Sequence, residues 1–251
     1  MDKLLGVISI LYIENLEKSY GQTKVLTRLN ISINKGEIVG IIGNNGSGKS
    51  TLLKIILGLV QKDKGDIYLF DKEYNFSKST KDIGFLIESP LLLEQLTGYD
   101  NLIYHFQLKK IDINYLGEMI NQFNLNSFIN EKVSTYSLGM RQILGVATAF
   151  VSESPFVILD EPINTLDPKN SSIIKKHMEE FVSQGGSILL TSHILSDIQE
   201  LCDRIYFLRN GELQEIDETF FETDTIEIKV SDEKKSAHIL QENKFIILKI
   251  T

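Results

Sequence analysis

Apolar positions recur along the chain with the two periods that distinguish strands from helices. Leu29–Ile33 alternates apolar and polar residues, as a half-exposed antiparallel strand does, whereas Ile38–Ile42 is a continuous apolar run typical of a buried parallel strand. The same criteria predict further strands over Tyr12–Leu16, Ile67–Phe70, Val157–Asp160, Ser187–Thr191 and Arg204–Leu208. The chain is therefore expected to contain strands of both kinds, interspersed with helical segments.

Helical spacing of apolar residues is found in two segments between these strands. The first is Thr51–Leu57, followed by Gly58; the second runs from Asn101 to about Val133. The core positions expected in the second are Leu102, Phe106, Leu116, Met119, Ile120 and Phe123. Thr97-Gly-Tyr-Asp100 fits a capping box at its start.

Turn-forming residues and prolines predict where other elements begin and end. Asp63-Lys-Gly-Asp66 is predicted to be a turn, and Pro155 is expected to break the helix that precedes the strand ending at Asp160. After Asp217 the pattern changes, and residues 218–251 are predicted to form a small appended β-α-β piece.

Composition narrows the class of protein. A net charge of −8 over 251 residues argues against a duplex nucleic-acid binder, which relies on clustered Lys and Arg. The single cysteine, Cys202, excludes an internal disulfide and is expected to be a small buried hydrophobe. Leu4–Ile13 is shorter than the roughly 18 apolar residues that span a bilayer, so any membrane association is expected to come through a partner.

A phosphate-binding loop, Gly43-Asn-Asn-Gly-Ser-Gly-Lys-Ser50, lies between a predicted strand and a predicted helix. Its glycines let backbone N–H groups turn toward a triphosphate, and the helix adds its positive end. Lys49 would contact the β- and γ-phosphates, and Ser50 would offer a hydroxyl to Mg²⁺. The complete motif in this context favours ATP binding over a simple Gly-rich turn. The nucleotide-binding residues expected here are Gly43, Asn44, Asn45, Gly46, Ser47, Gly48, Lys49, Ser50 and Thr51.

An acidic pair ends the strand Val157–Asp160. At the carboxyl edge of a sheet, Asp160 is placed to hold Mg²⁺ through water, and Glu161 to act as general base toward the attacking water. The alternative is an acidic pair that caps a surface turn.

The stretch Tyr136-Ser-Leu-Gly-Met-Arg-Gln142 lies between the phosphate loop and this acidic pair. In that order the motifs resemble those of ATP-binding cassette (ABC) ATPases over roughly residues 11–217. The resemblance implies an α/β fold: a RecA-like P-loop NTPase core with an antiparallel β subdomain and an inserted α-helical subdomain at about 87–150. It also implies a head-to-tail dimer, in which Ser137, Gly139 and Met140 contact ATP held by the second copy.

The resemblance assigns three further features. His193, after a predicted strand, would contact the γ-phosphate and join Glu161 and Lys49 in catalysis, while His105, His177 and His238 are expected to be ordinary histidines. Tyr20 resembles the aromatic residue that stacks on adenine, and Asn164–Asp167 resembles the loop that couples the two sites of the dimer.

Two departures from the usual family pattern suggest a subtype. Glu88 replaces a glutamine, and the signature is Tyr-Ser-Leu-Gly-Met where Leu-Ser-Gly-Gly-Gln is usual. Both resemble the ATPases of bacterial exporters for lantibiotic immunity and bacitracin-type resistance. Glu88 is an expected Mg²⁺ ligand; the alternative is sequence drift without a role.

The expected function is therefore an Mg²⁺-dependent ATPase subunit that energises export through a separate integral membrane permease, at the cytoplasmic face of the cell membrane. Leu91-Leu-Leu93 is either a docking surface for the permease or part of the core. The sequence does not name the cargo; a peptide antibiotic or another hydrophobic drug is the prediction. The alternatives are a regulatory ATP-binding protein with weak hydrolysis and a soluble ABC ATPase of translation or DNA repair.

Overall fold

The computed structural model describes residues 9–70, 72–73 and 83–216. They belong to the first of the two units into which the chain divides, Met1–Ile216. The β-α-β piece predicted for residues 218–251 lies outside the described residues.

The larger sheet of the described part has six strands in the order β10-β9-β3-β8-β7-β6. Neighbouring strands are parallel except for β10, which pairs antiparallel with β9. The strands are β3 (Ile38–Ile42), β6 (Gly84–Leu86), β7 (Phe156–Asp160), β8 (Ser187–Ser192), β9 (Arg204–Arg209) and β10 (Glu212–Ile216). Every residue of β3, β7 and β8 is buried, which explains their continuous apolar sequences.

The second sheet is antiparallel and has the order β2-β1-β4-β5 among the described residues. It consists of β1 (Ser9–Tyr20), β2 (Thr23–Asn34), β4 (Lys64–Leu69) and β5 (Lys72–Glu73). The turn predicted at Asp63–Asp66 is wrong, because β4 already begins at Lys64 and pairs there with Glu17 of β1.

The helices of the described part are α1 (Lys49–Ile56), α2 (Gly98–Lys109), α3 (Leu116–Gln122), α4 (Leu138–Phe150) and α5 (Pro168–Ser183). Short 3₁₀ turns lie at Ile113–Tyr115, Val133–Thr135 and Leu195–Asp197. The capping box at Thr97 and Asp100 is confirmed.

Two helix predictions are wrong. The segment from Asn101 to Val133 is not continuously helical, because Lys110 takes a left-handed conformation with φ 59° and ends α2. Pro155 does not end the next helix, since α4 stops earlier, at Phe150.

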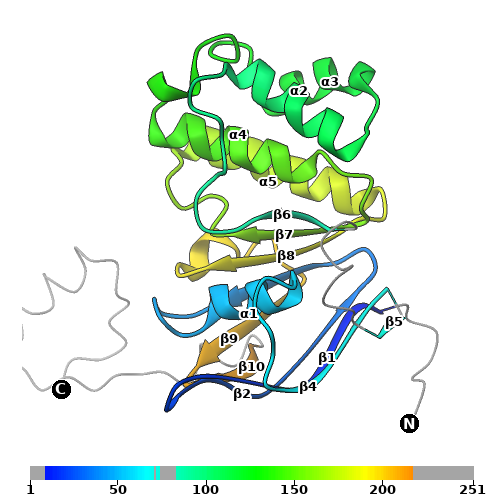
Figure 1. The fold of residues 1–251 in the computed structure, drawn as a ribbon, viewed down its shortest axis with the longest axis vertical. Coiled ribbons are helices and arrows are strands. Elements are labelled where there is room, and N and C mark those ends of the chain that lie inside the picture. Colours follow the sequence, from blue (N-terminus) through cyan, green and yellow to red (C-terminus); the bar gives the residue numbers. More distant parts are fainter. Residues whose placement is uncertain (1–8, 71, 74–82, 217–251) are drawn as a thin grey trace, which may run out of the picture. The chain divides into compact units, whose positions relative to one another are not determined.

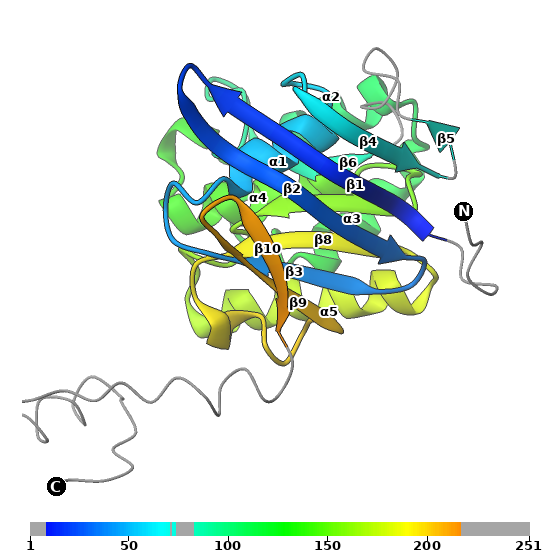
Figure 2. The same cartoon turned by 90° about the horizontal axis from the view of Figure 1, so that it is seen from below.

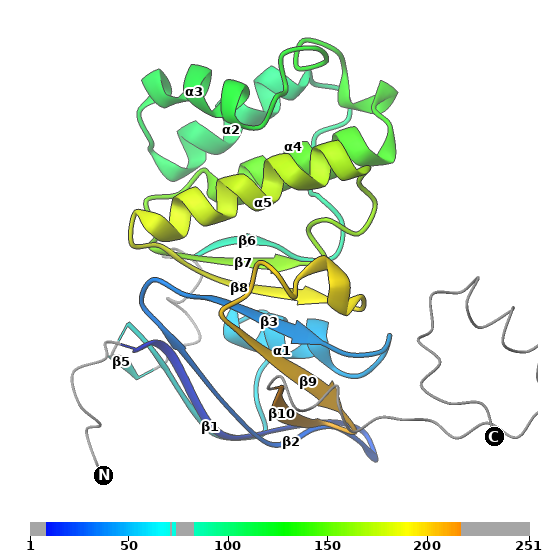
Figure 3. The same ribbon diagram turned by 180° about the vertical axis from the view of Figure 1, so that it is seen from behind.

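The six-stranded sheet separates two apolar cores, and its strands contribute to both because successive side chains point to opposite faces. Val157 and Leu159 of β7 pack with the helical side, whereas Phe156 and Ile158 pack with α1 and the antiparallel sheet. Figure 1 shows α4 and α5 between this sheet and the outer helices α2 and α3, with α1 on the opposite face. The same layers are seen from behind in Figure 3, and Figure 2 shows β1 and β2 crossing over the larger sheet.

Candidate nucleotide-binding site

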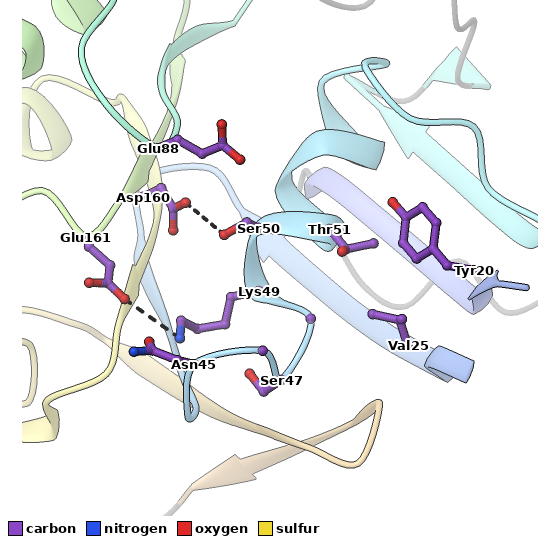
Figure 4. A pocket seen from close by; sticks show the side chains of 12 residues that line it. Tyr20, Val25, Asn45, Ser47, Lys49, Ser50, Thr51, Glu88, Asp160 and Glu161 are labelled. Carbon is purple, nitrogen blue, oxygen red and sulfur yellow. Dashed lines mark hydrogen bonds and ion pairs between the residues drawn. The ribbon is translucent and has the colours of Figure 1, made fainter. Parts of the chain in front are cut away.

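A cleft of ≈ 460 Å³ opens beside the loop that joins β3 to α1. Its walls come from this loop, from the antiparallel sheet and from the residues at the ends of β6 and β7 (Figure 4). The lining residues are Tyr20, Val25, Asn45, Gly46, Ser47, Gly48, Lys49, Ser50, Thr51, Glu88, Asp160 and Glu161. Most of the residues predicted for nucleotide and metal binding therefore meet in one place.

The loop owes its shape to its glycines. Gly46 and Gly48 have φ values of 80° and 111°, which residues with a Cβ rarely adopt. At Gly43 a Cβ would lie 2.6 Å from the backbone oxygen of Leu208, so the chain could not pass here with a larger residue. Gly43 and Asn44 do not line the cleft themselves, although Asn44 lines a neighbouring pocket.

Lys49 is held inside the loop and is only 6% exposed. Its Nζ donates a hydrogen bond to the Gly43 carbonyl oxygen at 2.6 Å and lies 3.8 Å from Glu161 Oε1. A buried ammonium group held at the start of a helix by the loop carbonyls can attract the anionic oxygens of a triphosphate.

Ser50 and Asp160 are joined across the cleft. Ser50 Oγ donates to Asp160 Oδ2 at 3.0 Å, and Thr191 Oγ1 donates to the other oxygen, Oδ1. No group of three His, Cys, Asp or Glu side chains that could hold a metal is found among the described residues. Mg²⁺ does not need one, because it keeps several waters and takes few protein oxygens beside substrate phosphates. The hydroxyl of Ser50 and the carboxylates of Asp160 and Glu88 fit such an ion.

Glu161 is oriented by Asn164, which lies three residues further along the chain, and by two residues at the end of β8. Its Oε2 lies 3.0 Å from His193 Nδ1 and accepts a hydrogen bond from Asn164 Nδ2 at 2.8 Å. Its backbone N–H donates to Thr191, and its φ of 48° is left-handed. His193 follows β8 and does not line the cleft, but it contacts the cleft through Glu161.

Tyr20 lies on the far side of the cleft from the acidic residues, as Figure 4 shows. It ends β1, is 50% exposed, and has Lys18 Nζ 5.3 Å from its ring centroid. Val25 of β2 adds an apolar surface that the sequence reasoning missed, although the hairpin that joins β1 to β2 brings it near Tyr20. An exposed aromatic ring beside an apolar side chain can stack on a flat base.

The predicted signature residues lie away from this cleft. Ser137 caps α4 by accepting a hydrogen bond from the Met140 N–H. The lining of the cleft does not include Ser137, Gly139 or Met140. A Cβ on Gly139 would lie 3.7 Å from a side-chain carbon of Leu166, so the turn packs beside the Asn164–Asp167 loop.

Gln142 is a second residue that the sequence reasoning missed. It lies in α4, is 8% exposed, and donates from Nε2 to the backbone oxygens of Glu161 and Pro162, each at 3.2 Å. The available signal was its position directly before the largely apolar segment Ile143–Phe150, on a helix that the core buries. The bond ties α4 to the segment that carries Glu161.

Cys202 packs partly buried against the core, as expected for a hydrophobe, and burial raises the pKa of its thiol to about 12.

Comparisons with known proteins agree with this geometry. The family described as "ABC transporter" matches residues 26–164. The lantibiotic transport ATP-binding protein SrtF of Streptococcus pyogenes is 37% identical over 81% of this chain and 89% of its own length. The ABC transporter ATP-binding protein YdbJ of Bacillus subtilis is 36% identical over 94% of this chain and 79% of its own length.

Solved structures lead to the same family. The ATP-binding subunit of an ABC transporter superposes with a TM-score of 0.77 at 28% identity, over 84% of this chain and 90% of that chain. Two structures of the cassette MJ0796 are described as dimeric, one of them as a post-hydrolysis state bound to ADP and Pi. Each superposes with a TM-score of 0.75 at 26% identity, over 82% of this chain and 97% of that chain. The chain therefore belongs to the ABC transporter family, as an ATP-binding subunit with the cassette fold.

Proposed function

We propose that this chain is the Mg²⁺-dependent ATP-hydrolysing subunit of an exporter, that two copies act as a head-to-tail dimer, and that a separate permease holds them at the cytoplasmic face of the membrane. The observation that carries the proposal is the orientation of Glu161, held by His193 and Asn164 beside the Lys49 ammonium group. A carboxylate fixed in this way can accept a proton from an attacking water.

Different residues of the cleft would bind the phosphates, the adenine and Mg²⁺. The loop N–H groups and Lys49 would hold the phosphates, and Tyr20 with Val25 would pack on the adenine. Ser50, Asp160 and Glu88 would hold Mg²⁺, which supplies positive charge that offsets the phosphate oxygens.

Glu161 would act as the general base. The hydrogen bond from Asn164 and the contact with His193 restrict the rotation of the Glu161 side chain, so that the carboxylate stays directed toward the cleft. The buried Lys49 would stabilise the negative charge on the transferred phosphoryl group.

A dimer would complete each site. Ser137, Gly139 and Met140 do not line the cleft of their own chain, and Leu138 between them is 66% exposed. An exposed turn at the N-terminus of α4 is free to meet the phosphates held by a second copy. The dimeric cassette structures support this arrangement.

An apolar surface before α2 supports a membrane partner. Leu91 is 87% exposed and Leu93 46% exposed, and both precede Thr97, where α2 is capped. Within the described part of the chain, no helix has the length and apolarity that crossing a bilayer requires. The names of SrtF and of a bacitracin transport protein of Enterococcus faecalis, 36% identical over 80% of this chain, support a peptide antibiotic as cargo.

The test is Mg²⁺-dependent phosphate release at increasing protein concentration, for the wild type, Glu161→Gln and the exposed control Glu153→Gln. We expect turnover per subunit to rise with concentration, and Glu161→Gln to lose about 100-fold or more, the range for removal of a general base. Glu153→Gln should behave as the wild type. Bound ATP without turnover at any concentration, with a permease present, would instead support a regulatory protein.

A further inference from the structure

The cleft carries an unfavourable balance of charge for an anionic ligand. Three of its lining residues are carboxylates (Glu88, Asp160 and Glu161), whereas one, Lys49, is an ammonium group. Like charges in a partly desolvated cleft repel each other more strongly than in water. A triphosphate therefore needs compensation from positive charge near these carboxylates.

Lys54 supplies a positive charge at the point where Glu88 enters the cleft. Its Nζ lies 2.5 Å from Glu88 Oε1 and donates a hydrogen bond to it. The lysine stands on α1 four residues after Ser50, so both side chains project from the same face of the helix.

The backbone conformation of Glu88 indicates that the Lys54–Glu88 ion pair is held in a fixed position. Glu88 follows β6 and takes a left-handed conformation, with φ 59°, that residues other than glycine seldom adopt. Such conformations persist where surrounding contacts hold them and are frequent at ligand-binding sites. The Glu88 side chain accepts a hydrogen bond from Lys54 in this position.

We propose that Lys54 is a positioning residue for nucleotide binding, which neutralises the Glu88 carboxylate and holds it at the rim of the cleft. This inference rests on the proposed function, since it concerns the same nucleotide. Lys54 acts through Glu88 rather than on the phosphates, so its importance depends on the negative charge at position 88. A glutamine there would make the lysine dispensable.

The experiment is calorimetric titration of the full chain with ATP in EDTA and low salt, where affinity reports charge and not metal ligation. The variants are Lys54→Ala, Lys54→Arg, Glu88→Gln and the double variant. Lys176→Ala is the matched control, because Lys176 also forms an exposed ion pair, with Glu180 at 3.5 Å, on α5.

We expect Lys54→Ala to weaken ATP binding about fivefold, the upper size for a partly exposed ion pair. Lys54→Arg and Lys176→Ala should stay within about twofold of the wild type, and adding Lys54→Ala to Glu88→Gln should change affinity by less than about twofold. Equal losses in both backgrounds would overturn the proposal, because Lys54 would then act on the nucleotide directly. No loss in either background would overturn it as well. Failure of the wild-type protein to bind ATP would refute the proposed function itself. The titration of the wild type alone therefore separates that outcome from a failure of the inference about Lys54.

Discussion

His177 makes the stability of this protein depend on pH in a predictable direction. It lies on α5 against the rings of Phe123 and Phe150, at centroid distances of 4.2 and 4.6 Å, and its buried Nδ1 has no hydrogen-bond partner among the residues that the structure describes. Burial lowers the pKa of His177 from 6.5 to about 4. The protein therefore holds this imidazole neutral where the unfolded chain would protonate it.

The size of the effect follows from linkage between protonation and folding. Because the pKa of the folded state is lower, the contribution to stability is complete above pH 6.5 and is lost as the pH falls toward 4. The two pKa values correspond to a loss of about 2 kcal/mol between about pH 7 and pH 5, and of about 3 kcal/mol once His177 is protonated in both states. For a protein of this size 2 kcal/mol lowers Tm by about 4–8 °C.

The assay is thermal and urea unfolding of the wild type and of His177→Leu between pH 7 and pH 5. We expect the wild type to lose about 2 kcal/mol relative to the variant as the pH falls, since leucine at this position cannot take up a proton. His105→Leu serves as comparison, because burial lowers the pKa of His105 as well. Parallel pH curves for the wild type and His177→Leu would refute the reasoning.

Two further substitutions test the fold and the partner surface. Gly84→Ala places a Cβ 2.2 Å from a backbone oxygen of α4. We expect a loss of about 1–3 kcal/mol in urea unfolding, whereas Gly117→Ala, with nothing within 4 Å, should not destabilise the protein. A destabilised Gly117→Ala would contradict this account. Leu91→Asp should lower permease-stimulated ATP hydrolysis, because the substitution places a charge on an apolar side chain that is 87% exposed. The activity of the isolated subunit should stay unchanged, because Leu91 is far along the chain from the phosphate loop. Leu108→Asp, at an exposed leucine of α2, is its control; equal losses in both variants would argue against a local docking surface.

The sequence was a poor guide wherever pairing between distant segments overrode local preference. Asp63–Asp66 has the residues of a turn, yet β1 passes so close that a Cβ on Gly65 would lie 2.5 Å from the Asn15 backbone oxygen. Glycine is needed there for the approach of a neighbouring strand, not for a turn. The helix α5 was not predicted, although Asp167 caps it and Pro168 occupies its first turn, both local signals that the sequence contained.

What the sequence determined by itself depends on residues that are near one another in the chain. The phosphate loop, the capping box of α2 and the buried strands were predictable, because a few consecutive residues fix each of them. The tertiary structure alone decided which side chains meet in the cleft. Glu161 and His193 are brought together by the parallel pairing of β7 with β8, and Lys54 and Glu88 meet because β6 pairs with β7 and ends beside α1. The covalent chain sets the spacing between residues within an element. The order in which the strands pair, β10-β9-β3-β8-β7-β6 in the larger sheet, sets the distances between elements, because it joins segments that are far apart in the sequence.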